Sequence, residues 1–386
     1  MNRKLTVLAV NDPAVAVYVD PKYKILKLFE QKYNVDVQFD IVDFDQYYPA
    51  LMDVFSGKRQ ADIVMVAGHF WLKDFVTKGY LQKVDYPSDD SYDRNDILPV
   101  IKKEMCIEGI PYLYPSFCDG HVILYRKSFI EKALKGKIDE VISTEQYLDI
   151  LEELSTHADF KGIAYRASAS EIFLDALPFL RNRGIEVFES NENFHYDVDL
   201  MVKALQDYMS LKRYAKGDMS LFGNHEVAQA LSLNQVSLGV SWGGQLGVIL
   251  NDQCIDKEDI GFSTFKTAWN VTWSFGVSQY ADKELSEQLL HYLTSKEVDQ
   301  IVGGYAGSPV RKSTYITDFD MYPWYPMHLQ LVENYAKPLP SVKEAGSLLQ
   351  IFYHRIYQAY IEELTVEEAA IHIEKDVLNA LKGTTS

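Results

Sequence analysis

The sequence predicts an α/β fold in which helices cover a largely parallel sheet. Apolar strand-like runs alternate with amphipathic helical segments between Lys4 and Gly68, which is the rhythm of strands joined by helical crossovers. Farther along, apolar runs follow one another across a short turn, which indicates antiparallel strands. The chain therefore builds one α/β region, interrupts it, and builds a second.

The N-terminal elements are predicted in the order strand, helix, strand, helix, strand. Their expected ranges are 4–10, 21–33, 35–44, 46–56 and 61–68. The second strand alternates apolar and polar residues, whereas the third is apolar throughout, as in a strand buried on both faces of a parallel sheet. Gly57 is expected to stop the second helix.

The middle of the chain breaks this order at Glu108-Gly109, a turn signal between two apolar runs. A further apolar run, HVILYR, follows and suggests strands that cross back between two regions. The later predicted helices span 143–155, 169–183, 198–213, 282–293, 348–363 and 366–381, and the later strands span 236–242 and 270–278. A glycine-rich turn is expected at 303–307.

Composition excludes several classes of protein. The 386 residues carry a net charge of −17, which disfavours a nucleic-acid partner, and no run approaches the length of a membrane-spanning helix. Cys106, Cys118 and Cys254 are interpreted as free thiols because they are few and irregularly spaced. The N-terminus does not have the pattern of a secretion signal, so the chain is expected either to be cytoplasmic or to lack a removed signal.

One motif raises the alternative of catalysis. Gly239-Val240-Ser241-Trp242-Gly243 fits the G-x-S-x-G pattern of serine hydrolases, with Ser241 as an esterase-like nucleophile. The acid and histidine that would complete a triad could come from Asp318 or Asp320 and from His354 or His372. No HGGG-type segment precedes the motif, and both histidines fall in helical patterns. A tight turn that displays an aromatic side chain is therefore favoured, and no catalytic residue is assigned.

Metal and nucleotide sites are not indicated, since the chain has no H-E-x-x-H, EF-hand or P-loop pattern. No cofactor is expected. What remains is a set of aromatic and polar residues near predicted strand ends, where ligands bind to open α/β sheets. The predicted ligand-binding residues are Asn11, Asp12, Asp45, His69, Trp71, Tyr114, Phe117, Asp119, Arg166, Trp242, Gly243 and Trp273. Aromatic rings pack on the C–H faces of sugars while polar groups bond hydroxyls, so a sugar-sized ligand is predicted.

Four segments in the same order resemble the carbohydrate-binding family of ABC transporter extracellular solute-binding proteins, the maltose-binding-protein-like family. They are ADIVMVAGHFWLKDFVTKGYLQKVD, IPYLYPSFCDGHVILYRKSF, the pair WSFGVSQYADKELSEQLLHYLTSKEVDQ and GSPVRKSTY, and LTVEEAAIHIEKDVLNAL. The resemblance implies a two-lobed, type II periplasmic-binding-protein fold whose lobes are joined by crossover strands, with a ligand cleft between them. Carried onto this chain, the resemblance implies that lobe 1 begins with residues 1–115 and that residues 116–270 belong mainly to lobe 2. Residues 271–320 would form the return strands and the lobe 1 hinge, and residues 321–386 would form C-terminal helices that pack on lobe 2.

The same resemblance implies the function. A sugar or oligosaccharide would be bound by hinge closure, without catalysis, and delivered to the permease subunits of an ABC importer by a monomeric protein. The protein would work outside the cytoplasm, in the periplasm or lipid-anchored at the cell surface, with its signal segment absent from this chain.

Site residues also follow from the resemblance. The stacking aromatic of the second lobe falls on Trp242, the tryptophan before F-G-V on Trp273, and the crossover aromatic on Tyr114 or Phe117. His69 departs from the family, which has an acidic residue just past the third strand. Two roles are open for Arg166. In a site for neutral sugars, it would bridge ligand hydroxyls or pair with Glu171. In a site for an acidic sugar, its guanidinium would bind the carboxylate of the ligand with two hydrogen bonds.

Overall fold

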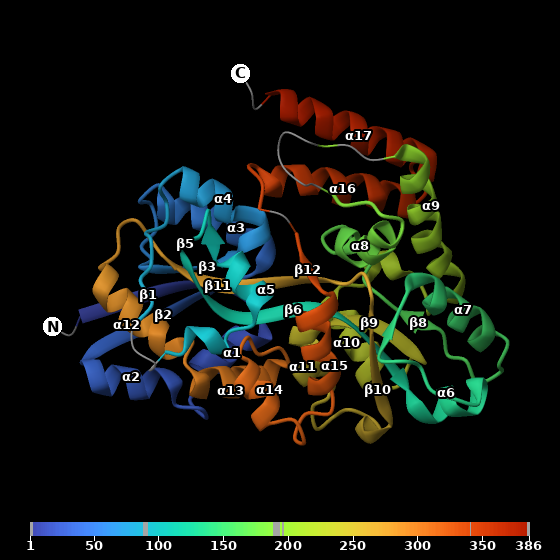
Figure 1. Cartoon of the computed structure of the whole chain (residues 1–386), viewed down its shortest axis with the longest axis horizontal. Helices are drawn as coiled ribbons and strands as arrows, with labels where there is room; N and C mark the ends of the chain where they lie inside the picture. The colour runs from blue at the N-terminus through green and yellow to red at the C-terminus, as the bar shows by residue number, and fades with distance from the viewer. Residues whose placement is uncertain (1–2, 88–91, 188–193, 195–196, 340, 384–386) are drawn as a thin grey trace. The chain divides into compact units, whose positions relative to one another are not determined.

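The chain folds into two compact units, each assembled from separated stretches of sequence. The first unit comprises Met1–Asp119 and Val271–Pro326, and the second comprises Gly120–Asn270 and Met327–Ser386. The structure, a computed structural model, describes residues 3–87, 92–187, 194, 197–339 and 341–383 (Figure 1). The polypeptide passes from one unit to the other within strand β6 (Leu113–Arg126), within strand β11 (Trp269–Val277) and within helix α15 (Tyr325–Gln330).

The first unit is built on a sheet whose central strand lies parallel to two others. Its strands are β1 (Arg3–Val10), β2 (Val35–Val42), β3 (Ile63–Ala67) and the later part of β11. β1 pairs in parallel with β2 and β3, and β11 pairs antiparallel with β3, so that Trp273 stands opposite Ala67. The fully buried β3 confirms the interpretation of its continuous apolar run.

Helices cover both sides of this sheet. In Figure 1, α3 (Phe44–Phe55) and α4 (Gly68–Thr77) lie on one side, and α1 (Pro13–Val19), α2 (Ile25–Tyr33) and α13 (Lys296–Ala306) lie on the other. The remaining elements of this unit are α5 (Pro99–Glu104), the hairpin β4 (Cys106–Ile107) and β5 (Ile110–Pro111), α12 (Lys283–Leu293) and α14 (Lys312–Thr317). Glu108 and Gly109 both have positive φ between β4 and β5, which confirms the predicted turn.

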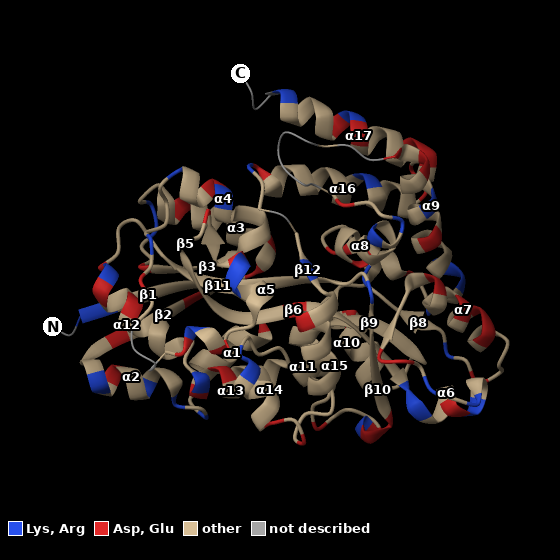
Figure 2. Cartoon of the chain, viewed as in Figure 1, with Lys and Arg blue, Asp and Glu red and all other residues tan. Residues whose placement is uncertain are grey.

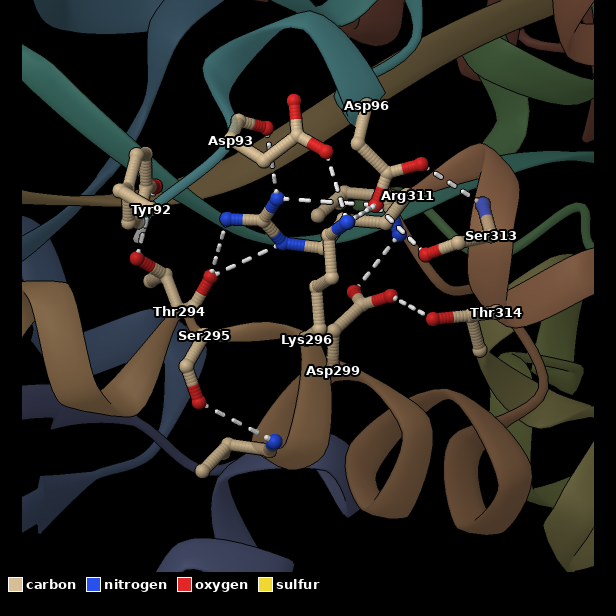
Figure 3. A network of polar contacts seen from close by, with 12 residues as sticks. Tyr92, Asp93, Asp96, Thr294, Ser295, Lys296, Asp299, Arg311, Ser313 and Thr314 are labelled. Atoms are coloured by element: carbon tan, nitrogen blue, oxygen red, sulfur yellow. Dashed lines mark hydrogen bonds and ion pairs between the residues drawn. The ribbon is translucent and has the colours of Figure 1, made fainter. Parts of the chain in front are cut away.

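A buried arginine ties the segment around residues 92–97 to the C-terminal helices of the first unit (Figure 3). The Arg311 guanidinium donates to the carbonyl oxygen of Thr294 at 2.8 and 3.1 Å and to that of Asp93 at 3.0 Å. It lies 3.7 Å from the Asp96 carboxylate and 4.7 Å from the centre of the Tyr92 ring. These contacts replace much of the interaction that the guanidinium would have with water, and the side chain is fully buried.

The strands of the second unit are hydrogen-bonded in the order β8, β9, β6, β10, β7. Its strands besides β6 are β7 (Val141–Ile142), β8 (Ile163–Ala164), β9 (Leu238–Trp242) and β10 (Ile260–Phe265). β6 pairs antiparallel with β9 and β10, whereas β8 lies parallel to β9. A short strand, β12 (Lys337–Pro338), pairs in parallel with the start of β11.

The helices of the second unit include a layer in which α8, α9, α16 and α17 pack on one another (Figure 1). The helices are α6 (Lys127–Leu134), α7 (Thr144–Ser155), α8 (Ile172–Asn182), α9 (Val198–Met209), α10 (Asn224–Ser232), α11 (Leu246–Ile249), α16 (Ala345–Tyr360) and α17 (Val366–Gly383). Ser143 and Gln146 form a reciprocal capping box at the start of α7, as the sequence predicts. Acidic and basic residues are interspersed along α6 and α17, whereas the charged residues of α7 are all acidic (Figure 2). None of the described helices is both long and apolar enough to span a bilayer.

Some predicted local structures differ from the observed ones. The glycine-rich turn is instead the end of a helix, because Gly303 and Gly304 belong to α13 and only Gly307 follows it. The third strand was expected to reach Gly68, but Gly68 and the aromatic run after it form the start of α4. The helix expected over 169–183 begins at Ile172, because a turn with hydrogen bonds to the Ser168 carbonyl precedes it. Helix α1, which the sequence analysis left out, begins at Pro13 and is capped by the Asp12 carboxylate.

Candidate functional site

The first unit gathers polar residues at the carboxyl edge of its sheet. Because β1 and β2 run in parallel, with Val10 opposite Val42, the residues that follow them emerge side by side. Asn11 donates from Nδ2 to Asp43 Oδ1 at 2.8 Å, and its backbone N–H bonds the Val42 carbonyl. This places an exposed amide and carboxylate at the strand ends, where the sequence predicts the ligand.

Aromatic rings stand beside these polar groups, and two of them are exposed. Trp71 and Trp273 lie 5.9 Å apart at 70°, and each is largely covered by a neighbour on α3. Phe44 lies 6.4 Å from Trp273, and Tyr48 lies 5.8 Å from Trp71. Phe44 and Tyr48 are 44% and 43% exposed, so they are the accessible members of this group. We call Phe44, Tyr48, Trp71 and Trp273 the first-unit aromatic group.

Phe44, Tyr48 and Asp43 were missed by the sequence analysis. The signal was present, because Phe44 and Tyr48 are four residues apart and therefore share one face of a helix that starts directly at a strand end. Asp45, which was predicted, is exposed in the first turn of α3, where its negative charge is favourable for the helix dipole.

Two further predicted residues, Asp12 and Asp119, lie close enough to influence each other's charge. Partial burial raises the pKa of the Asp12 carboxyl above its ordinary value, and the charge of Asp119 raises it further. Asp12 also accepts the Ala14 N–H at 2.8 Å as the cap of α1. The pair can therefore offer both a proton donor and an acceptor to a hydroxyl group. His69 is buried, and burial lowers its pKa to about 3, so it is neutral at physiological pH.

Two of the predicted crossover residues are buried inside the first unit. The Tyr114 hydroxyl donates to the Asp85 carbonyl at 2.9 Å and lies 2.7 Å from His291 Nε2. Phe117 is fully buried. The structure therefore does not bring Tyr114 and Phe117 to the accessible surface at which Phe44 and Tyr48 lie, because β6 is covered on both of its faces in this region.

The second unit holds a separate set of predicted residues at the ends of β8 and β9. These strands are parallel, with Ala164 opposite Gly239, so Arg166 and Trp242 emerge at the same edge. The Arg166 guanidinium lies 3.6 Å from the centre of a Trp242 ring. The cation–π contact occupies one face of the indole, and Trp242 is only 5% exposed.

The Asp175 carboxylate on α8 holds Arg166 in place. It accepts the Arg166 backbone N–H at 2.8 Å and receives Nε at 3.2 Å and Nη2 at 2.5 Å. The remaining nitrogen, Nη1, donates to Asn224 Oδ1 at 3.0 Å. Burial by itself would raise the pKa of Asp175, but Arg166 and then His121 hold it below its ordinary value.

His121 and Trp269 complete this cluster. The His121 ring lies nearly parallel to Trp242, with the ring centres 5.4 Å apart at 19°, and its Nε2 is 3.4 Å from Asp175. Trp269 stands at 78° to Trp242, 4.4 Å away, and donates from Nε1 to the Leu174 carbonyl. We call Arg166, Asp175, His121, Trp242 and Trp269 the second-unit tryptophan cluster.

Gly243 belongs to the packing of this region. A Cβ atom at this position would lie 2.3 Å from His328 Nε2 of α15, so only glycine permits the close approach. The Trp242 indole N–H is buried and has no acceptor among the described residues. A buried donor without an acceptor is uncommon in folded proteins, and a ligand hydroxyl would satisfy it.

The geometry does not fit a serine nucleophile at Ser241. In a G-x-S-x-G elbow the serine sits on a sharp turn between a strand and a helix, with its hydroxyl exposed. Here Ser241 lies inside β9, paired with Val122 of β6, and is 1% exposed. The motif is therefore part of a regular strand, and the glycines on either side of Ser241 serve packing.

The chain was compared with protein families and with solved structures. A family described as bacterial extracellular solute-binding protein matches residues 16–300. A maltose-bound MalE3 from Thermotoga maritima is similar to this chain, with 19% identity, a TM-score of 0.84, and coverage of 98% of this chain and 99% of the other.

Two further solved structures have the same fold. An ABC transporter solute-binding protein of Agrobacterium vitis, with bound D-mannitol, has 20% identity and a TM-score of 0.82, and 99% of each chain is covered. The GacH receptor of Streptomyces glaucescens, described unliganded and with acarbose, has 20% identity and a TM-score of 0.81, again with 99% of each chain covered. The chain therefore has the two-lobed fold that the sequence analysis predicts.

Proposed function

Because the chain belongs to the family of bacterial extracellular solute-binding proteins, we propose that it binds a sugar or sugar alcohol and passes it to an ABC importer. The observation that carries this proposal is the first-unit aromatic group, in which exposed Phe44 and Tyr48 rings stand beside the Asn11 amide and the Asp43 carboxylate. Exposed ring faces beside hydrogen-bonding groups suit a pyranose or a polyol. The sugars and the polyol bound by the three similar proteins support the same class of ligand.

We further propose that the ligand is uncharged. All three nitrogens of the Arg166 guanidinium already have acceptors on Asp175 and Asn224, and the charge of Arg166 is balanced by Asp175. The residue is therefore a support for Trp242 rather than a receptor for the carboxylate of an acidic sugar. Trp242 would contribute its unsatisfied indole N–H to a ligand hydroxyl, and not a free ring face.

The proposed mechanism is closure of two units around the ligand. A chain that passes three times between its units can act as a hinge, and a ligand with higher affinity for the closed state shifts the population toward it. The closed form would then be recognised by the permease subunits, with the protein working as a monomer outside the cytoplasmic membrane. No bond in the ligand changes.

A thermal-shift screen with maltose, maltotriose, D-mannitol and glucuronate tests the ligand class. At a concentration of 100 Kd, a binding sugar stabilises the protein by about 2.7 kcal/mol, which raises the melting temperature. We expect at least one neutral compound to do so and glucuronate not to. Small-angle X-ray scattering with the binding compound should then show compaction. A protein that responds to none of the neutral compounds would contradict the proposal.

Replacing Tyr48 or Phe44 by alanine is expected to weaken binding of that sugar by about 1–3 kcal/mol, because each variant removes one ring face from the ligand. Isothermal titration calorimetry measures the loss. Tyr280→Ala is the matched control, since Tyr280 is a 66% exposed tyrosine of the same unit outside the aromatic group. Equal affinities for all three variants would remove Tyr48 and Phe44 from the site.

A further inference from the structure

A second concave site lies on the first unit, formed by α13 and the segment that follows α14. Its volume is about 410 Å³, within the range of small-molecule sites. The residues that define its chemistry are Tyr23, Gln300, Tyr305, Asp318, Met321 and Tyr322. It shares no residue with the first-unit aromatic group or the second-unit tryptophan cluster.

Three tyrosines line this pocket. Tyr305 is 44% exposed and packs edge-on against Tyr23, with ring centres 6.2 Å apart at 73°. Tyr322 lies directly over Gly304 of α13, where a Cβ atom would come within 2.2 Å of its hydroxyl oxygen. The absence of a side chain at Gly304 thus lets the Tyr322 ring lie against the helix, so the position of this ring depends on the glycine.

A single charged residue, Asp318, lines the pocket together with the tyrosines. Asp318 is 7% exposed, and Gln300 Nε2 donates to its Oδ1 at 2.8 Å. No hydrogen bond to Oδ2 is found among the described residues. Oδ2 is not fully buried, and Asp318 lines the pocket, so this oxygen is available to a bound cation.

Tyr322 and Tyr23 lie close to Asp318. Burial raises the pKa of Tyr322, and the charges of Asp318 and Tyr23 raise it further, which places the three oxygen-bearing groups near one another. Tyrosine rings also present electron-rich faces, and the ammonium of Lys22 already lies 5.2 Å from the Tyr23 ring centre. The pocket therefore attracts positive charge through both its rings and its carboxylate.

We propose that this pocket binds a small organic cation, an alkylammonium or a guanidinium compound, which the tyrosine rings surround and the Asp318 carboxylate neutralises. A compact cation with an apolar surface satisfies both kinds of group at once, as quaternary ammonium ions do in aromatic cages. A neutral polyol could hydrogen-bond the Asp318 carboxylate but would not neutralise its charge. The net charge of −17 favours the approach of such a cation.

The test compares choline with 3,3-dimethyl-1-butanol, which has the same shape without the charge, and includes guanidinium as a second cation. Titration calorimetry, and NMR of the ligands, should show saturable binding of the cations to the full chain and binding of the alcohol that is at least about tenfold weaker. Asp318→Asn keeps the size and the Gln300 contact but removes the charge, and should lower the affinity for choline by about tenfold or more.

Two further variants make the result specific. Asp320→Asn removes the same charge from an exposed neighbour and should leave the affinity for choline unchanged. Tyr305→Ala removes one exposed ring while retaining Asp318, and should also weaken binding. The proposal is overturned if neither cation binds saturably, if the alcohol binds as well as choline, or if Asp318→Asn and Asp320→Asn behave alike. Because the sugar titration uses different residues, these outcomes are independent of the proposed sugar binding.

Discussion

Asp175→Ala is expected to lower the free energy of unfolding by about 3–5 kcal/mol, the usual cost of leaving a buried charge without its partner. In the variant, the Arg166 guanidinium would stay buried with only the Asn224 hydrogen bond and the Trp242 ring, while His121 would lose its neighbouring carboxylate. Denaturant unfolding monitored by tryptophan fluorescence should report the change, because Trp242 and Trp269 lie in the same cluster.

The matched control is Asp207→Ala. Asp207 also pairs with an arginine, Arg183, at 2.5 Å, but both side chains are about one-third exposed. A pair in contact with water contributes less than about 1 kcal/mol, so this variant should be nearly as stable as the parent. Equal losses for Asp175→Ala and Asp207→Ala would show that the buried charge of Arg166 is not what makes Asp175 necessary.

The effect of Asp175→Ala should also depend on pH. Since Arg166 and His121 outweigh burial and hold the pKa of Asp175 below its ordinary value, the carboxylate contributes its stability in full above the pKa of the unfolded chain, 3.8. That contribution is lost as the pH falls through the lower pKa of the folded state. The difference between parent and variant should therefore be constant near neutrality and shrink below about pH 4.

Arg311→Ala is the second change with a large expected effect, a loss of about 3–5 kcal/mol in the first unit. The substitution would remove both side-chain donors to the Thr294 carbonyl, leave the Asp93 carbonyl with only the Asp96 N–H, and take the buried cation from Asp96 (Figure 3). Arg311 connects residues 92–97 to Thr294, which directly follows α12. In the variant, amide hydrogen exchange should therefore accelerate in residues 92–97 before the whole unit unfolds.

Lys296→Ala provides the comparison for Arg311. Lys296 bonds Asp93 at 2.6 Å within the same network but is 43% exposed, so its removal should cost less than about 1 kcal/mol. Arg311→Lys keeps the charge but cannot reproduce three directed bonds, and should fall between the two alanine variants. If Arg311→Ala were as stable as Lys296→Ala, the buried arginine would not be the anchor of this segment.

The local features of the fold were predictable from sequence because their causes are local. The apolar run of β3, the Ser143 cap and the Glu108-Gly109 turn each follow from a few adjacent residues. Helix α1 was missed because its valines, alanines and tyrosine do not form a helical stripe that stands out in so short a segment.

For the candidate site, the sequence predicted only that the residues lie near strand ends, and not which side chains contact one another. Glu171 was one of the partners considered for Arg166, but α8 begins at Ile172, and Asp175, one turn into that helix, is the residue that reaches the guanidinium. His121 and Trp269 could not have been paired with Trp242 from sequence, because strand register across the sheet brings them together. Burial of Tyr114 is likewise decided by its contact with His291, a residue far away in the chain.

The position of β11 has a consequence for synthesis of the protein. In the first unit this strand pairs with β3, yet it leaves the ribosome only after the whole of the stretch from Gly120 to Asn270. An early nascent chain therefore exposes one edge of β3 until its late partner is translated, and such an edge is open to incorrect pairing.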